Sequence, residues 1–418
     1  MTLRTLGIDF GTSNSAAGFM AEGQPRLIEV ENGHTTLPTS VFFDFEERST
    51  VFGTSANTAL IAGEYGRFMR ALKSVLGTSL MHEKRTLLNE RLDFVDIIAM
   101  FLATLKARAE AASGLSFSHA LSGRPVHFHS EDAKKDKQAE ADLRACYLKA
   151  GFQDVRFMYE PEAAALSNNS HLDTGTLGLI VDIGGGTSDF SLFRLNAARR
   201  VEILASHGVR VGGTDFDRKI SIDHVMPLLG KGSQIRKEFG TDTATAPNAI
   251  FHNLATWEKI PFLYNAESRR EAKELEKYAV ERPLLARLSS ALENEIGHDI
   301  AFAVEQGKIE ANDPAHMSGT IDLGVLEPHL HVALTDKAQN LSLVSLSAKI
   351  ETCAKETLEM AELRPDQVES VIYVGGSSLM GVVEASIAHI FPSAAPHKSS
   401  AFTAVANGLS IASATAFG

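Results

Sequence analysis

Two segments of the chain share one pattern of apolar and polar residues. They span residues 6–15 and 179–189, and each is followed by another apolar stretch. In both, an apolar run reaches an Asp, turns through Gly and then offers Thr and Ser side chains. This pattern predicts a β-hairpin with a polar tip. Two such hairpins predict two similar lobes, each presenting its polar turn to a shared cleft.

The rest of the chain alternates between helical and strand-like periodicity. Residues 93–112 place apolar residues at helical spacing, and a short apolar run at residues 370–374 ends in a glycine turn, as a buried strand does. Helices are predicted at 93–112, at 130–150, from about 380 and at 402–415, and residues 267 to about 310 are predicted to form the longest helical tract, which is charged. A strand is predicted at 370–374, and residues 121–126 are predicted to form a strand that leads into a Pro turn. The charged tract is interpreted as a solvated helical face.

Composition narrows the function classes. The 418 residues include 40 Lys and Arg against 52 Asp and Glu, which gives a net charge of −12. An acidic surface repels phosphate backbones, so a general nucleic-acid or anionic-membrane binder is not expected. Cys146 and Cys353 have no metal-site spacing and are interpreted as buried thiols of a reducing compartment. Neither a signal peptide nor a membrane-length apolar run is visible, so the cytoplasm is expected.

The two hairpin turns suit a phosphate ligand. Gly11, Thr12 and Ser13 in one turn, and Gly184–Gly186 with Thr187 in the other, supply closely spaced N–H and hydroxyl donors. Asp9 and Asp182 end the preceding strands, and two facing carboxylates favour a cation between them. Mg²⁺ suits such a site when phosphate provides further ligands. No Gly-Lys-Ser/Thr follows either turn, so this is not a Walker A loop.

The same residues resemble the nucleotide-binding domain of the heat-shock protein 70 (DnaK-type) chaperones, within the actin-like ATPase superfamily. The similarity continues in order along the chain. It includes Asn32-Gly33, Leu37–Val41, Ala71–Gly77 with Lys73, Tyr159–Ala165 with Glu160, Val211–Asp217, Glu305 with Lys308, and Val374–Ser377. The resemblance implies an α/β, actin-like (ribonuclease H-like) fold with duplicated mixed five-stranded sheets flanked by helices.

The resemblance also implies a division of the chain. Lobe I would span residues 1–172 with an inserted subdomain at about 38–115. Lobe II would span 173–395 with an inserted helical subdomain at about 223–339, and residues 396–418 would return to lobe I as a final helix.

The resemblance assigns roles residue by residue. ATP or ADP with Mg²⁺ would be bound, and water would attack the γ-phosphate in line. The implied catalytic residues are Lys73, Glu160, Asp182 and Thr187, with Asp189 beside them. The implied metal residues are Asp9 and Asp182. The implied nucleotide-binding residues are Gly11, Thr12, Ser13, Asn14, Gly184, Gly185, Gly186, Thr187, Gly212, Gly213, Glu305, Lys308, Gly375, Gly376 and Ser377.

Three positions depart from the family pattern. Ile309 and Leu379 stand where the family has Arg residues that stack on adenine, and Phe402 stands where it has an Asp. Losing two stacking guanidinium groups predicts weaker adenine recognition. The chain ends where the family's nucleotide-binding domain ends, so the peptide-gripping sandwich and lid are expected to be absent, as in the lid-less YegD-type relatives.

These features favour a slow, chaperone-like ATPase switch that works with protein clients or co-chaperones. A non-catalytic nucleotide-binding or interaction module is the alternative, and sugar-kinase or filament-forming relatives form a third class, for which no sugar-site Asp is recognised. The pairs His127/His129 and His329/His331 each lie on one strand face, but without a third ligand they are interpreted as ordinary histidines.

Overall fold

The computed structural model describes residues 4–31, 33–129, 132–168, 172–236, 242–398 and 401–417. By its internal contacts the chain divides into two compact units. Unit 1 consists of residues 1–210, 350–379 and 386–418, and unit 2 consists of residues 211–349 and 380–385. The lobe boundaries expected from the sequence stay a prediction.

Unit 1 contains two mixed sheets. The first has the strand order β11–β10–β1–β2–β3, with β4 paired to β2, and the second has the order β14–β13–β12–β19–β20. The strands of the first are β1 (Thr5–Phe10), β2 (Asn14–Ala21), β3 (Gln24–Leu27), β4 (Thr36–Pro38), β10 (His119–Arg124) and β11 (Asp154–Tyr159). Those of the second are β12 (Leu177–Ile183), β13 (Ser188–Leu195), β14 (Val201–Val209), β19 (Ser370–Val374) and β20 (Ala395–His397).

The two sheets repeat the same strand directions. Strand β1 pairs antiparallel with β2 and parallel with β10, and β12 likewise pairs antiparallel with β13 and parallel with β19. The outer pairs match as well, because β2–β3 and β13–β14 are antiparallel while β10–β11 and β19–β20 are parallel. The predicted hairpins and the duplicated α/β fold are confirmed.

Smaller elements surround these sheets in unit 1. They are the strands β5 (Ser40–Asp44), β6 (Ser49–Phe52), β7 (Gly66–Arg70), β8 (Arg85–Leu87) and β9 (Glu90–Leu92), and the helices α1 (Thr54–Ile61), α2 (Phe94–Ser113), α3 (Ala133–Lys149), α4 (Glu160–Ser167) and α12 (Ala404–Ser413). Short 3₁₀ turns add η1 (Leu72–Val75), η2 (Ser79–His82), η7 (Pro365–Gln367) and η8 (Gly376–Leu379).

Unit 2 is mainly helical. Its elements are α5 (Gly213–Ile220), η4 (Ser221–Val225), η5 (Met226–Leu229), β15 (Gln234–Arg236), β16 (Thr243–Thr245), α6 (Asn248–Leu254), η6 (Trp257–Leu263), α7 (Ala266–Tyr278), α8 (Arg282–Glu293), α9 (Gly297–Ala311), β17 (Ser318–Asp322) and β18 (His331–Thr335). Helices α10 (Asp336–Met360) and α11 (Gly381–Ile390) contribute residues to both units.

Helix α2 shows how the apolar pattern builds the core of unit 1. Asp93 caps its first turn by accepting from the Asp96 N–H, and the Asp96 carboxylate accepts from the Asp93 N–H in return. The ring of Phe101 lies 5.9 Å from that of Phe10 on β1. The apolar residues that recur at helical spacing are all buried: Phe94, Ile97, Ile98, Phe101, Leu102 and Leu105. The helix ends at Gly114 in the left-handed conformation. This helix is confirmed as predicted.

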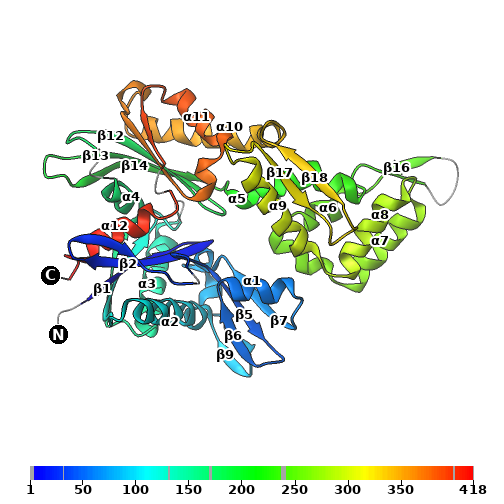
Figure 1. Cartoon of the computed structure of the whole chain (residues 1–418), viewed down its shortest axis with the longest axis horizontal. Coiled ribbons are helices and arrows are strands. Elements are labelled where there is room, and N and C mark those ends of the chain that lie inside the picture. Colours follow the sequence, from blue (N-terminus) through cyan, green and yellow to red (C-terminus); the bar gives the residue numbers. More distant parts are fainter. Residues whose placement is uncertain are drawn as a thin grey trace. The chain divides into compact units, whose positions relative to one another are not determined.

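Helix α12 packs closely against α4 and β1 (Figure 1). A Cβ added to Gly408 would lie 1.8 Å from the carbonyl oxygen of Ala163, and one added to Gly7 would lie 2.7 Å from the carbonyl carbon of Leu409. Only glycine permits backbones to approach this closely. The last described helix is therefore fixed to the first strand of the chain.

Some sequence-based boundaries were wrong. The tract at 267–310 is three helices, α7, α8 and α9, and α10 is longer than any of them. Pro283 near the start of α8 and Glu295, whose φ is +56°, mark the breaks. The strand expected to lead into a Pro turn within 121–126 is β10, which begins two residues earlier, at His119, and ends at Arg124, directly before Pro125. The predicted start of the 130–150 helix at Ser130 lies outside the described residues, as does Asn32.

Candidate functional site

The turns of the two hairpins lie beside each other in unit 1. A Cβ added to Gly185 would lie 2.5 Å from the Oγ of Ser13, so the β12–β13 turn contacts the β1–β2 turn. The first turn is held by the Thr39 N–H, which donates to the Ser13 carbonyl oxygen at 2.8 Å. The second is closed by the Gly184 N–H donating to the Thr187 carbonyl oxygen at 3.0 Å. The structure thus brings together two donor-rich turns from the two sheets.

The two turns differ in how much space surrounds their glycines. A Cβ on Gly11 would lie 2.2 Å from the carbonyl oxygen of Asn14, whereas one on Gly186 would meet nothing within 4 Å. Gly186 and Thr187 are exposed, while Gly184 and Gly185 are half-buried. The part of the second turn at Gly186 and Thr187 is therefore open to solvent, and exposed turn backbone is the kind of structure that binds anions.

Strand pairing places the acidic residues at the ends of the central strands. Asp182 on β12 lies directly across from Asp189 on β13, and on its other side it lies beside Val374 of β19. Asp9 occupies the matching position on β1 of the other sheet, across from Ala16. The position of Asp189 opposite Asp182 follows from the hairpin register, which the sequence pattern alone did not assign.

Lys73 and Glu160 form an ion pair next to these carboxylates. The Lys73 Nζ lies 2.6 Å from the Glu160 Oε1, and each side chain is only 11% exposed. Lys73 lies on η1, which follows Ala71 in the left-handed conformation with φ of +57°. Glu160 is the first residue of α4, and Gly123 leaves room for it, because a Cβ there would lie 3.1 Å from the Glu160 Cγ. Two segments 87 residues apart thus form one charged pair.

The acidic residues influence each other's protonation. Burial, and then the charge of Glu160, raise the pKa of Asp9 to about 7, although the Lys73 ammonium group opposes the shift. Burial, Glu160 and Asp189 raise the pKa of Asp182 well above its usual range. Burial also raises the pKa of Asp189 to about 6, against a hydrogen bond from the Thr187 hydroxyl. The cluster holds more negative charge than one lysine neutralises.

Lys73 remains fully protonated in this setting. Burial alone would lower its pKa, but the charges of Glu160 and Asp9 outweigh that effect and raise it. A divalent cation near Asp9 and Asp182 would relieve the remaining repulsion among the carboxylates, and hard oxygen donors are the ligands that Mg²⁺ prefers. The donor set therefore fits Mg²⁺, with Asp9 and Asp182 as the residues that would hold it.

A third loop of unit 1 reaches the Asp182 carboxylate. Gly375 follows β19 with φ of +79°, and a Cβ on it would lie 2.4 Å from the Ile183 carbonyl oxygen and 3.5 Å from the Asp182 Oδ1. A Cβ on the next residue, Gly376, would lie 2.5 Å from the ring of Phe402. Ser377 follows in η8 and is half-buried. Phe402 is 65% exposed, so its ring lies over the glycine turn and faces solvent.

The other residues expected at the nucleotide lie in unit 2. Gly212 precedes α5, and its N–H donates to the Asp215 carboxylate at 3.1 Å. Gly213 begins that helix and is buried. On α9, Lys308 is 7% exposed and pairs with Asp217 at 2.7 Å, which fixes α9 to α5. Glu305 lies one turn earlier on α9, and Ile309 is 55% exposed. The nucleotide contacts of these residues stay a prediction.

The histidine pairs do not form metal sites within the described part of the chain. His129 Nε2 lies 2.7 Å from the Leu76 carbonyl oxygen, and His331 Nδ1 lies 2.9 Å from the His329 carbonyl oxygen. Neither pair belongs to a group of three metal-binding side chains among the residues described. His207, Cys353 and Glu356 form a separate group of metal-binding side chains, which no sequence motif indicated.

The duplicated sheets, with Asp9 and Asp182 at matching strand ends and glycine turns beyond them, define the actin-like ATPase fold. A family model described as Hsp70 protein matches residues 5–246, which is 242 of the 418 residues. The chain belongs to the Hsp70 family of nucleotide-binding, chaperone-type ATPases. Among the described residues, none of the helices has both the length and the apolar character needed to cross a bilayer.

Proposed function

We propose that this chain binds ATP together with Mg²⁺ and hydrolyses it slowly, as a nucleotide-driven switch in chaperone work. The observation that supports this most directly is the Lys73–Glu160 pair, 2.6 Å apart, beside Asp9 and Asp182 and next to two contacting glycine turns. Phosphoryl transfer to water needs positioning and charge neutralisation rather than covalent chemistry from the protein, and these groups supply both.

Each group has a definite task in this proposal. Lys73 and Glu160 orient and polarise the attacking water, with Thr187 and Asp189 beside it. The turns at Gly11–Asn14 and Gly184–Thr187 donate N–H and hydroxyl hydrogen bonds to phosphate oxygens. Asp9 and Asp182 would hold Mg²⁺. When bound, Mg²⁺ neutralises the negative charge of the phosphates.

The predicted nucleotide-binding residues outside the two hairpin turns would bind the base and sugar. Gly212, Gly213, Glu305 and Lys308 are proposed as nucleoside contacts, and Gly375–Ser377 as further nucleotide contacts. Client proteins or co-chaperones are the proposed partners, and the similarity to YegD-type relatives stays a prediction.

A second candidate is a module that binds nucleotide without turnover. Ile309, which is 55% exposed, and Leu379 stand where adenine-stacking Arg residues are expected, so base recognition is weakened. Weaker recognition of the base lowers affinity and selectivity but leaves the phosphate groups untouched.

Calorimetry of the metal-depleted protein with ATP, GTP and ADP, with and without Mg²⁺, tests the binding step. We expect Mg²⁺-dependent binding of ATP and a small preference for ATP over GTP. Binding that ignores Mg²⁺, or no binding at all, would contradict the proposal.

Phosphate release tests turnover. Lys73→Ala should keep nucleotide binding but lose phosphate release on the order of 100-fold or more, and Glu160→Gln should lose it as well. Unchanged phosphate release in Lys73→Ala would refute the role of that lysine. Nucleotide binding without phosphate release in the unmodified protein would favour the second candidate.

A further inference from the structure

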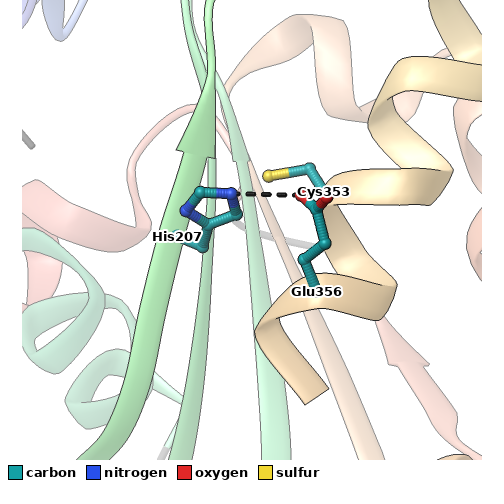
Figure 2. Close-up of side chains that lie close together, drawn as sticks. All are labelled: His207, Cys353 and Glu356. Carbon is teal, nitrogen blue, oxygen red and sulfur yellow. Dashed lines mark hydrogen bonds and ion pairs between the residues drawn. The ribbon is translucent and has the colours of Figure 1, made fainter. Parts of the chain in front are cut away.

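Three side chains of metal-binding type converge in unit 1. His207 lies on strand β14, and Cys353 and Glu356 lie one turn apart on helix α10, which faces that strand at this point (Figure 2). One imidazole nitrogen, the Cys353 Sγ and one carboxylate oxygen all lie within 4.8 Å of one another. Among the described residues, this is the one group of three such side chains that close.

The local structure explains why the three meet. His207 pairs with Phe190 of β13 in the second sheet. Residues three apart on a helix share a face, so Cys353 and Glu356 point to the same side of α10. Figure 2 shows the Cys353 sulfur directed toward the imidazole ring and the Glu356 carboxylate reaching the same ring. The His207 Nε2 lies 3.2 Å from the Glu356 Oε2.

Exposure differs among the three in a way that suits an open metal site. Cys353 is 2% exposed, so the sulfur forms the floor of the group. The side chains of His207 and Glu356 are 37% and 51% exposed, so a metal held between them would still contact water. Three protein ligands with one position open to solvent is the coordination seen in catalytic and exchangeable zinc sites.

The separations are close to those a tetrahedral ion needs. With zinc bonds of roughly 2.0–2.3 Å, neighbouring ligand atoms lie about 3.3–3.6 Å apart. The His207–Glu356 distance is already 3.2 Å, and the other separations, at most 4.8 Å, shorten by rotation of side chains that are partly in solvent.

The ligand set selects among ions. Zinc and neighbouring transition-metal ions favour a ligand set of one thiolate, one imidazole and one carboxylate. Mg²⁺ and Ca²⁺ prefer oxygen ligands alone. Burial raises the pKa of the Cys353 thiol to about 12, with the charges of Glu356 and Asp189 adding to the shift. An ion that binds the Cys353 sulfur must displace the thiol proton to solvent. Ions with low affinity for sulfur do not displace it.

We propose that His207, Cys353 and Glu356 bind a Zn²⁺ ion, with water as the fourth ligand. In forming the site, the S–H bond of Cys353 breaks, its proton passes to solvent, and a sulfur–metal bond takes its place. The ordinary alternative is a surface His–Glu pair, which contributes little to stability, above a buried thiol that behaves as a small apolar group. The proposal does not depend on nucleotide binding.

Cobalt(II) gives a direct test, because it occupies zinc sites and a thiolate–cobalt bond produces a charge-transfer band in the near ultraviolet. The metal-depleted full chain is titrated with Co²⁺ in excess Mg²⁺, which occupies oxygen-only sites. We expect the band to saturate at one equivalent and to disappear when Zn²⁺ is added. No band, or a band that excess Mg²⁺ abolishes, overturns the proposal.

Variants assign the ligands. Cys353→Ser should lose the band, whereas Cys146→Ser, at the other buried cysteine, should keep it. Because a buried substitution can disturb folding, His207→Ala and Glu356→Gln, at exposed side chains, provide the second measurement. Each should weaken Co²⁺ and Zn²⁺ binding at least tenfold, while His316→Ala, at an exposed histidine that pairs with Asp313, should leave it unchanged. Unchanged affinity in His207→Ala and Glu356→Gln, or loss of the band in Cys146→Ser, would show that the ion binds elsewhere.

Discussion

Replacing Lys73 by Met removes the ammonium group that balances the carboxylates near the glycine turns. Its Nζ lies 2.6 Å from the Glu160 Oε1, and both side chains are only 11% exposed, so the pair belongs with buried rather than surface ion pairs. Removing one partner of a buried pair leaves an uncompensated charge and costs about 3–5 kcal/mol. We expect a loss of unfolding free energy of that size at pH 8 in the metal-free, nucleotide-free protein.

Solution pH should change this loss in a definite direction. Lys73 lowers the pKa of Asp9, Asp182 and Asp189, which burial has raised, so its removal raises all three further. A folded state with raised carboxyl pKa values binds more protons than the unfolded chain, and stability therefore falls as pH rises through those values. The cost of Lys73→Met should be smaller at pH 6, where these carboxyl groups are more protonated, than at pH 8.

Urea denaturation followed by circular dichroism, in the presence of a chelator, measures the effect. Lys355→Met is the matched control, because its Nζ also lies 2.6 Å from a glutamate, Glu351, but the two side chains are 52% and 28% exposed. That surface pair should contribute no more than about 0.5 kcal/mol. In the double variant Lys73→Met/Glu160→Gln the orphaned carboxylate is gone, so part of the loss should be recovered. A loss in Lys73→Met no larger than that in Lys355→Met, or no recovery in the double variant, would refute this reasoning.

Two further predictions concern stability. The pKa of Asp9 is about 7 in the folded protein, against an ordinary value of 3.8. Asp9→Asn should therefore stabilise the metal-free protein by about 1–4 kcal/mol at pH 8, and this gain should vanish below about pH 4. Lower stability of the variant at pH 8 would contradict the raised pKa. Gly408→Ala should destabilise the protein by more than about 3 kcal/mol, because the new methyl group would lie 1.8 Å from the Ala163 carbonyl oxygen. Gly186→Ala, where a Cβ meets nothing within 4 Å, should change thermal stability little, and equal losses in the two glycine variants would refute the packing argument.

The fold was predictable where its signals are local. Alternating apolar residues, an Asp and a glycine turn lie within a dozen positions in each hairpin, so the period of the pattern and the turn chemistry were enough to predict β1–β2 and β12–β13. The helix at 93–112 carried both its capping Asp93 and its apolar face in the sequence. The breaks within 267–310 were missed because charged helical periodicity continues across them, and the short interruptions carry weak turn signals.

The candidate site was less accessible from the sequence, because it is built from distant segments. Lys73 and Glu160 are separated by 87 positions, and family resemblance, not spacing, connected them. His207 and Glu356 are 149 positions apart, and no motif surrounds either residue, so their convergence with Cys353 depends wholly on how α10 lies against β14. Phe402 likewise gave no sign that its ring would lie over Gly376.

The contact between α12 and β1 sets the order in which unit 1 can be completed during translation. A ribosome releases β1 early, but Gly7 and Gly18 pack against Leu409 and Ser410 of α12, which are synthesised much later. The surface around the two glycines therefore stays uncovered by α12 until those residues have emerged. A nascent chain stalled before Ala404 would therefore present the apolar surface of an unfinished sheet. Such a chain would itself need protection from aggregation while synthesis is completed.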